Sequence, residues 1–76
     1  MMARVDLSWE DQAGGSQSTS GMLEDRSTHG ASIRLRMPVH VGCKVSIRWP
    51  KGPFTGLVRN CRKVKGDYVI GVQQID

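Results

Sequence analysis

The sequence predicts an all-β protein that folds as a six-stranded antiparallel β-barrel. Six short runs among its 76 residues alternate apolar and polar side chains, which is the pattern of half-buried strands. Glycine, proline and aspartate separate these runs at roughly even spacing, and no segment repeats its apolar residues with the period of a helix. An open sheet of this size would expose hydrogen-bonding edges, and closure into a barrel removes them.

The first two strands are expected to form a hairpin. Residues 3–9 alternate, with every second residue from Val5 onward apolar, so one face of this strand is expected to be buried. Segment 11–15 interrupts the alternation with an aspartate and two glycines, which indicates a hairpin loop. We place the second strand at about residues 18–24.

Two strands with clear alternation follow. Residues 31–37 form the third, and Pro38 ends it because proline has no N–H to donate to the ladder. Residues 43–49 form the fourth and alternate most regularly of all. The residues expected to face solvent along it are Lys44, Ser46 and Arg48.

The last two strands differ in regularity. Residues 54–64 form the fifth, in which Val58 and Leu57 fall on opposite faces, so we expect a bulge or a two-sided environment. Residues 68–75 form the sixth, after a tight connection at 65–67. The residues that we expect in the core are Leu35, Val45, Ile47, Ile70 and Val72.

Length and composition bound the class of protein. We expect a single domain over residues 1–76, or a fragment of a longer protein, and a domain this small buries only about 60% of its unfolded surface. A partner protein or an adjacent domain could therefore share its core. The chain has no apolar run of membrane-spanning length and no apolar signal region after Met1, so we expect a cytoplasmic protein that does not enter the membrane.

The two cysteines favour a structural role. Cys43 and Cys61 stand 18 residues apart, with only two histidines in the chain to complete a metal site. A zinc site needs four ligands at recognisable spacing, so we predict no metal and no cofactor. Both cysteines are expected to be reduced and to lie half-buried in the core.

Charge is divided unevenly along the chain. Residues 1–32 carry two arginines against five acidic residues, whereas residues 33–76 carry nine basic residues against two acidic ones. The second half could therefore meet an anionic partner. The simpler interpretation, which we favour, is that these cations are the solvated faces of strands.

The segment 24–30, between the second and third strands, carries the polar chemistry. Asp25 and Ser27 place a carboxylate and a hydroxyl two residues apart, which suits hydrogen bonding to a planar polar ligand. Gly30 allows either a close backbone approach or a positive φ. The simpler alternative is a turn in which Asp25 and Ser27 bond their own backbone. The candidate ligand-binding residues are Asp25, Ser27 and Gly30, with Arg26 ranked above His29 as an added cation or stacking surface.

The order of these features resembles the PilZ family, many of whose members bind the bacterial second messenger cyclic di-GMP. Asp25, Ser27 and Gly30 match the family motif D/N-x-S-x-x-G residue by residue, and the resemblance extends from about Val5 to Gln74. It implies a six-stranded split barrel that acts as a receptor in second-messenger signalling. In such a site the Asp25 carboxylate would accept from the N1–H and N2–H₂ donors of guanine.

One family motif is missing from the chain. Ligand-binding members carry R-x-x-x-R just before the first strand, where the arginines grip the phosphates and stack on guanine, and no two arginines here stand four apart. Either the motif lies before Met1 in a longer protein, or the domain binds the nucleotide weakly or not at all. The start of the sequence directly on a strand favours the first explanation.

The sequence also bears on three other functions: protein interaction, nucleic-acid binding and catalysis. A protein-interaction adaptor without a nucleotide is the main alternative, with Trp9, Trp49, Phe54 or Tyr68 as anchors if they are exposed. Nucleic-acid binding by the basic half is disfavoured, because the few aromatic residues near the cations fall in apolar phase. We predict no enzymatic activity, because alternate residues of one extended segment point apart and cannot form a nucleophilic triad.

Overall fold

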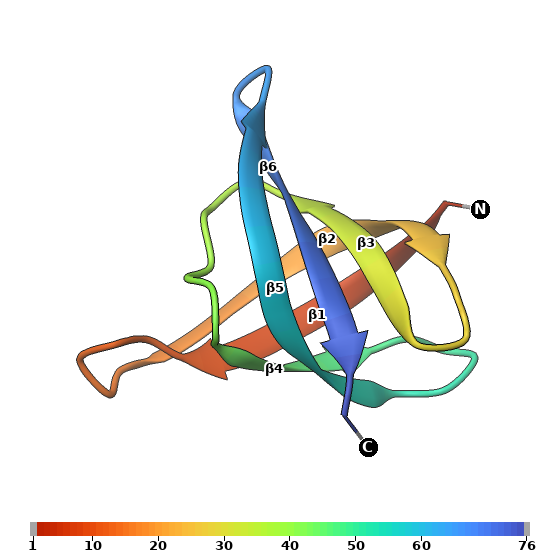
Figure 1. Cartoon of the computed structure of the whole chain (residues 1–76), viewed down its shortest axis with the longest axis horizontal. Coiled ribbons are helices and arrows are strands. Elements are labelled where there is room, and N and C mark those ends of the chain that lie inside the picture. Colours follow the sequence, from red (N-terminus) through yellow and green to blue (C-terminus); the bar gives the residue numbers. More distant parts are fainter. Residues whose placement is uncertain (1, 76) are drawn as a thin grey trace.

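The computed structural model describes residues 2–75 as a closed barrel of six antiparallel strands (Figure 1). Each strand pairs with two neighbours in the order β1-β2-β3-β6-β5-β4, and β4 returns to pair with β1. The predicted architecture is confirmed. The strands are β1 (Ala3–Glu10), β2 (Ser16–Arg26), β3 (Gly30–Leu35), β4 (Lys44–Arg48), β5 (Phe54–Val64) and β6 (Asp67–Gln74).

The strand β2 is longer at both ends than the predicted range 18–24. At its start, Asp11 closes the hairpin loop: its backbone N–H donates to the carbonyl of Gly15, and its carboxylate accepts from the N–H groups of Ala13 and Gly15. Pairing with β1 therefore begins directly at Ser16, opposite Glu10. The polar sequence 16–18 gave no apolar alternation from which this could be predicted.

The barrel interior is filled by apolar side chains from all six strands. The five residues predicted to form the core are buried, and the three predicted to face solvent on β4 are exposed. The aromatic residues Trp9 and Phe54 are also buried, which leaves neither of them as an exposed anchor. The buried apolar cluster comprises Val5, Leu7, Trp9, Leu23, Ile33, Leu35, Val39, Cys43, Val45, Ile47, Phe54, Val58, Ile70 and Val72.

Two bulges change which side chains face inward. The predicted bulge in β5 lies between Val58 and Asn60. A second bulge, which we did not predict, lies in β2 between Leu23 and Asp25. A bulge adds one residue to a strand, so the alternation resumes with the opposite phase beyond it.

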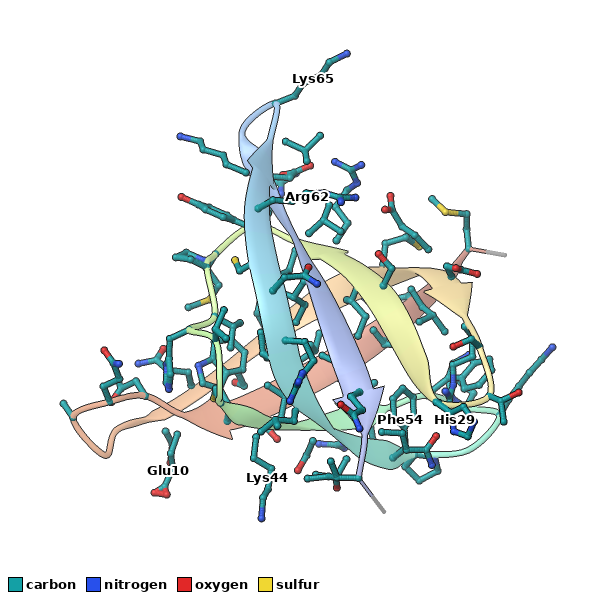
Figure 2. The ribbon with its side chains drawn as sticks, viewed as in Figure 1. Glu10, His29, Lys44, Phe54, Arg62 and Lys65 are labelled. Carbon is teal, nitrogen blue, oxygen red and sulfur yellow. The ribbon has the colours of Figure 1, made fainter. Side chains whose placement is uncertain are left out.

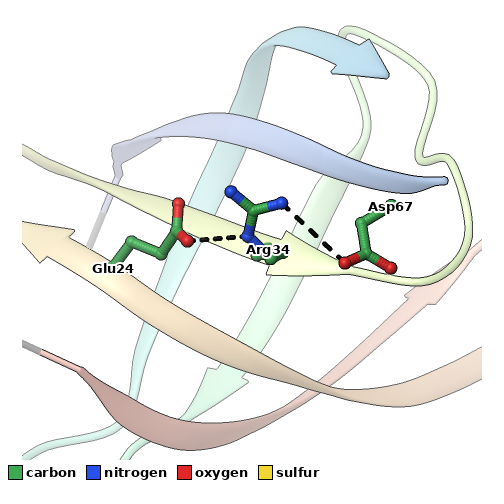
Figure 3. Close-up of polar contacts among 3 residues, drawn as sticks. All are labelled: Glu24, Arg34 and Asp67. Carbon is green, nitrogen blue, oxygen red and sulfur yellow. Dashed lines mark hydrogen bonds and ion pairs between the residues drawn. The ribbon is translucent and has the colours of Figure 1, made fainter. Parts of the chain in front are cut away.

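An ion-pair chain crosses the outer surface beside the β2 bulge (Figure 3). Arg34 on β3 donates from Nε to the Glu24 carboxylate at 2.7 Å, and its Nη1 lies 3.8 Å from the Asp67 carboxylate. The hydrogen bond to Glu24 is the main cause that raises the pKa of Arg34 above its ordinary value, and the charges of Glu24 and Asp67 add to it. This chain joins β2, β3 and the start of β6 on the outside of the barrel.

Both cysteines are unpaired thiols that pack in or against the core, although Cys43 is more deeply buried than the half-buried position predicted for it. Cys43 is buried, and burial raises the pKa of its thiol. Cys61 is half-buried and packs against the buried cluster. Within residues 2–75 we find no group of three or more histidine, cysteine, aspartate or glutamate side chains placed to hold a metal ion. The same part of the chain contains no helix long and apolar enough to cross a membrane.

We expect Ile47→Ala to lower the free energy of unfolding by about 2–4 kcal/mol, because it leaves a cavity in a fully enclosed core. The neighbouring exposed change Ser46→Ala is the matched control and should stay within about 0.5 kcal/mol of wild type. Urea unfolding followed by tryptophan fluorescence measures both. Equal effects of the two changes would contradict the inward orientation of Ile47.

The loop carboxylate Asp11 should make stability depend on pH. The hydrogen bond from the Gln17 side chain, followed by that from the Gly15 N–H, lowers the pKa of Asp11 below its ordinary value. A carboxyl with a lower pKa when folded stabilises the protein above its unfolded pKa, and that contribution is lost as the pH falls through the folded pKa. The stability difference between wild type and Asp11→Asn should therefore be largest near neutral pH and shrink below about pH 4. Urea unfolding at a series of pH values checks this, and a difference independent of pH would contradict it.

Candidate ligand-binding site at the β2–β3 connection

The connection between β2 and β3 is shorter than the predicted polar turn 24–30. Strand β2 runs to Arg26 and β3 begins at Gly30, so only residues 27–29 form the connection. The Ser27 N–H donates to the Gly30 carbonyl at 2.9 Å, and the Ser27 hydroxyl approaches the same oxygen at 3.3 Å. Ser27 therefore closes the turn with its own backbone and side chain, which is the simpler role considered for it above.

Asp25 lies within β2 and faces outward because of the bulge. Leu23 is buried opposite Ile33, and the bulge then allows Glu24 and Asp25 to lie outside the barrel together. The Asp25 side chain is exposed, and its carboxylate has no hydrogen bond or ion pair within residues 2–75. It is thus placed to accept hydrogen bonds from a ligand.

Asp25 begins a polar row that crosses four strands. It pairs with Ser32 on β3, Ser32 pairs with Gly71 on β6, and Gly71 pairs with Asn60 on β5. Paired residues of neighbouring strands face the same side of a sheet, so the four positions line one strip of the outer surface. We refer to Asp25, Ser32, Gly71 and Asn60 as the polar row.

Two glycines near Asp25 let other groups approach the backbone closely. A Cβ atom on Gly30 would lie 2.5 Å from the carbonyl oxygen of Val72, so this position has room for glycine alone. Its φ is not positive, so the close approach, and not a left-handed conformation, accounts for Gly30. A Cβ on Gly71 would lie 2.8 Å from Nδ2 of Asn60, which means that the Asn60 amide lies over the Gly71 backbone.

Arg26 points toward the barrel interior, because the bulge reverses the phase of the strand. Its partner across β3 is Ala31, which packs against the core. Its Nη1 donates to the carbonyls of Ser27 at 2.7 Å and Gly30 at 3.0 Å, and its Nη2 donates to Oε1 of Gln74 at 2.6 Å. The guanidinium therefore donates its hydrogen bonds to groups of the protein itself, whereas the sequence predicted a cation available to the ligand.

His29 is exposed at the same end of the barrel as Phe54 (Figure 2). Its backbone carbonyl accepts from the Gln74 N–H at 2.8 Å, which ties the connection to the end of β6. Its imidazole has no hydrogen bond or ion pair within residues 2–75. The structure thus brings Asp25, Ser27, His29 and Gly30 together at one end of β2 and β3.

Two cations of the β5–β6 hairpin are not gathered at this end. Arg62 and Lys65 lie along the β5–β6 hairpin, away from His29 (Figure 2). Arg59, at the β5 bulge, is exposed and directly precedes Asn60 of the polar row. The register thus places Arg59 as the β5 cation next to the polar row.

Sequence analysis missed three members of the polar row. Ser32, Gly71 and Asn60 reach Asp25 only through the pairing of β3 with β6 and of β6 with β5. One signal pointed to them: a glycine inside an otherwise apolar strand, as at Gly71, often marks a place where another group approaches the backbone closely. The bulge at Asn60 was the second such signal.

A different concavity of about 690 Å³ lies on the outer face of β1, β2 and β4. Small hydroxyl side chains, Ser8, Ser18 and Ser46, form its floor, and Arg4 and Arg48 stand beside them. The motif residues are absent from its lining. It is therefore a separate surface, formed where short side chains face each other across three strands.

The polar row suits a flat ligand with hydrogen-bond donors. Asp25 supplies an acceptor, and Asn60, whose amide lies over the Gly71 backbone, supplies both an acceptor and donors. A scan against protein-family models matches residues 3–76 to the PilZ domain. Searches of curated proteins and of solved structures gave no match. The closed six-stranded barrel, the D-x-S-x-x-G motif and a family match that spans the chain lead to one conclusion: this chain belongs to the PilZ domain family.

Proposed function

We propose that the domain is a cyclic di-GMP receptor of bacterial second-messenger signalling. The observation that carries this proposal is the position of Asp25, which is exposed, free of partners within residues 2–75 and at the start of the polar row. Guanine offers the N1–H and N2–H₂ donors that a free carboxylate accepts. Family membership supports the same ligand class.

The other residues of the site have distinct proposed roles. Gly30 lets the motif turn approach the Val72 carbonyl closely, and Asn60, whose amide lies over the Gly71 backbone, can bond the ring or the ribose. Arg59 provides an exposed cation next to the row for a phosphate. Ser27 stabilises the turn through its bonds to Gly30, so its contribution is chiefly to the shape of the site.

Affinity in this chain should be low. No two arginines stand four apart in the sequence, so the phosphate-gripping pair of ligand-binding members is absent from these 76 residues. Each missing charge-assisted contact corresponds to about 1.5–3 kcal/mol, or roughly one to two decades in Kd. We place the domain in the cytoplasm.

A second candidate is a protein-interaction adaptor, and the absence of the arginine pair from the sequence is the observation that favours it. An adaptor would use the same barrel without the nucleotide. Catalysis is not part of either proposal, because the Ser27 hydroxyl contacts the Gly30 carbonyl and makes no hydrogen bond to His29 within residues 2–75. Neither candidate requires a metal or a cofactor.

We expect cyclic di-GMP to shift the backbone amide signals of residues 24–32, 60 and 71 in a two-dimensional ¹H–¹⁵N NMR titration. Asp25→Ala should raise the Kd at least about tenfold, because it removes the acceptor for the guanine donors. Asp6→Ala, an exposed aspartate on β1, is the matched control and should leave the Kd unchanged. An absence of shifts at millimolar nucleotide would contradict the receptor and favour the adaptor.

The same titration with cyclic di-AMP tests base recognition. Adenine lacks the N1–H and N2–H₂ donors, so wild type should bind it more weakly, and Asp25→Ala should reduce the difference between the two nucleotides. Raising the salt concentration should weaken binding of both, since cation–phosphate attraction is screened. Equal discrimination by wild type and Asp25→Ala would show that the carboxylate does not contact the base.

A further inference from the structure

Arg26 is a cation held by neutral groups. Its three hydrogen bonds go to the carbonyls of Ser27 and Gly30 and to the amide oxygen of Gln74. Within residues 2–75 no carboxylate lies within ion-pair distance of its guanidinium. Within residues 2–75 its charge is therefore not neutralised by a carboxylate, although most of its donors are used.

Two aromatic rings, those of Phe54 and Trp49, pack against the Arg26 guanidinium. Its central carbon lies 4.1 Å from the centroid of the Phe54 ring and 6.0 Å from that of Trp49. A planar guanidinium packs on an aromatic face while its edge donates hydrogen bonds. Its Nε is buried without a hydrogen-bond partner within residues 2–75, so the ring contacts and the three bonds must outweigh that cost.

The hydrogen bond to the Ser27 carbonyl determines which way the next amide points. The peptide bonds of residues 2–75 are all trans, and in a trans peptide the carbonyl and the following N–H point in opposite directions. Because Nη1 of Arg26 holds the Ser27 oxygen, the N–H of Thr28 faces away from the guanidinium. Thr28 is exposed, and its N–H makes no hydrogen bond within the described chain.

We propose that Arg26 is a positioning residue, which holds the β2–β3 connection so that the Thr28 N–H is presented to an anionic group of the ligand. Gly30 strengthens the argument, because its carbonyl accepts from Arg26, from the Ser27 N–H and from the Ser27 hydroxyl. The Gly30 carbonyl oxygen thus links the Arg26 guanidinium to the backbone and side chain of Ser27. Through Gln74 the same guanidinium ties the turn to the end of β6.

This inference rests on the proposed function, and it differs from a direct contact between Arg26 and the ligand. A lysine at position 26 would keep the positive charge, so a direct electrostatic contact would survive in part. The same lysine cannot donate as a planar fork to two carbonyls and an amide while packing on Phe54. Arg26→Lys therefore separates the two roles.

The test uses the whole chain, with NMR detection before and after addition of cyclic di-GMP. Without ligand, Arg26→Lys should move the Thr28 amide signal and speed hydrogen exchange of the Ser27 N–H, which bonds to Gly30. With ligand, it should raise the Kd at least about tenfold, the scale of one charge-assisted hydrogen bond. Arg36→Lys is the matched control on an exposed arginine and should change neither readout.

A second control separates positioning from stability. Val39→Ala removes buried volume in the β3–β4 connection, on the opposite side of the barrel in Figure 1. It should lower the melting temperature and leave the Kd and the Thr28 signal unchanged. If Arg26→Lys does not fold, Phe54→Leu removes the ring but keeps the carbonyl bonds, and it should speed Ser27 exchange by itself.

Two results would overturn the positioning role. They are wild-type affinity in Arg26→Lys, and wild-type Ser27 exchange with an unmoved Thr28 signal in the folded variants. Failure of wild type to bind either cyclic dinucleotide counts against the proposed function alone, since the ligand-free exchange and shift measurements still decide whether Arg26 holds the turn. Faster hydrogen exchange of the Ser27 N–H in Arg26→Lys supports the positioning role of Arg26.

Discussion

The candidate site depends on the pairing of β3 with β6. This pairing joins residues 30–35 to residues 68–73, and it inserts the last strand between β3 and β5 (Figure 1). Without it, Asp25 and Ser32 would have no glycine surface beside them, and the Asn60 amide would not reach the same face. The end of β6 also brings Gln74 to Arg26. The contacts that form the site are therefore long-range, and they form only when the barrel closes.

Barrel closure and side-chain alternation could be predicted from the sequence, because both follow from the period of two in a strand. Val45 and Ile47 are buried and Lys44 and Arg48 exposed because the strand 44–48 contains no irregularity. The alternation fails as a guide where a bulge adds a residue. The apolar residues of β5 do not keep one phase, so its bulge could be predicted. The β2 bulge was not predicted, and the inward orientation of Arg26 was therefore missed.

Arg26 illustrates a second limit of pattern analysis. A charged residue in a polar segment is normally exposed, since burial of a charge is costly. Here the cost is reduced by three hydrogen bonds and an aromatic face, and these partners come from β3, β5 and β6 as well as from the turn. Such a set of partners is a property of the strand order. Strand order is not contained in the local alternation of apolar and polar residues.

Charge on this barrel is separated by region. The exposed carboxylate of Asp25 and the enclosed cation Arg26 lie next to each other in sequence but on opposite faces of the sheet. Arg62 and Lys65 of the β5–β6 hairpin lie away from His29 of the β2–β3 connection (Figure 2). A ligand at the polar row would therefore meet the Asp25 carboxylate and the Arg59 cation, and the field of Arg62 and Lys65 would act over a longer distance.

The β2 bulge sets the orientation of the motif because it shifts the alternation of inward and outward side chains by one residue. Leu23 is fixed inward by the core, so the one extra residue between it and Asp25 decides that the carboxylate faces outward and the guanidinium inward. A regular strand with the same residues and no bulge would exchange the two, placing a carboxylate against Phe54 and a cation at the ligand surface. The bulge between Leu23 and Asp25 is thus as necessary to the site as the chemistry of the motif. A homologue that keeps the aspartate, serine and glycine and the same spacing from the buried leucine, but has a regular strand in place of the bulge, would carry the motif without the site.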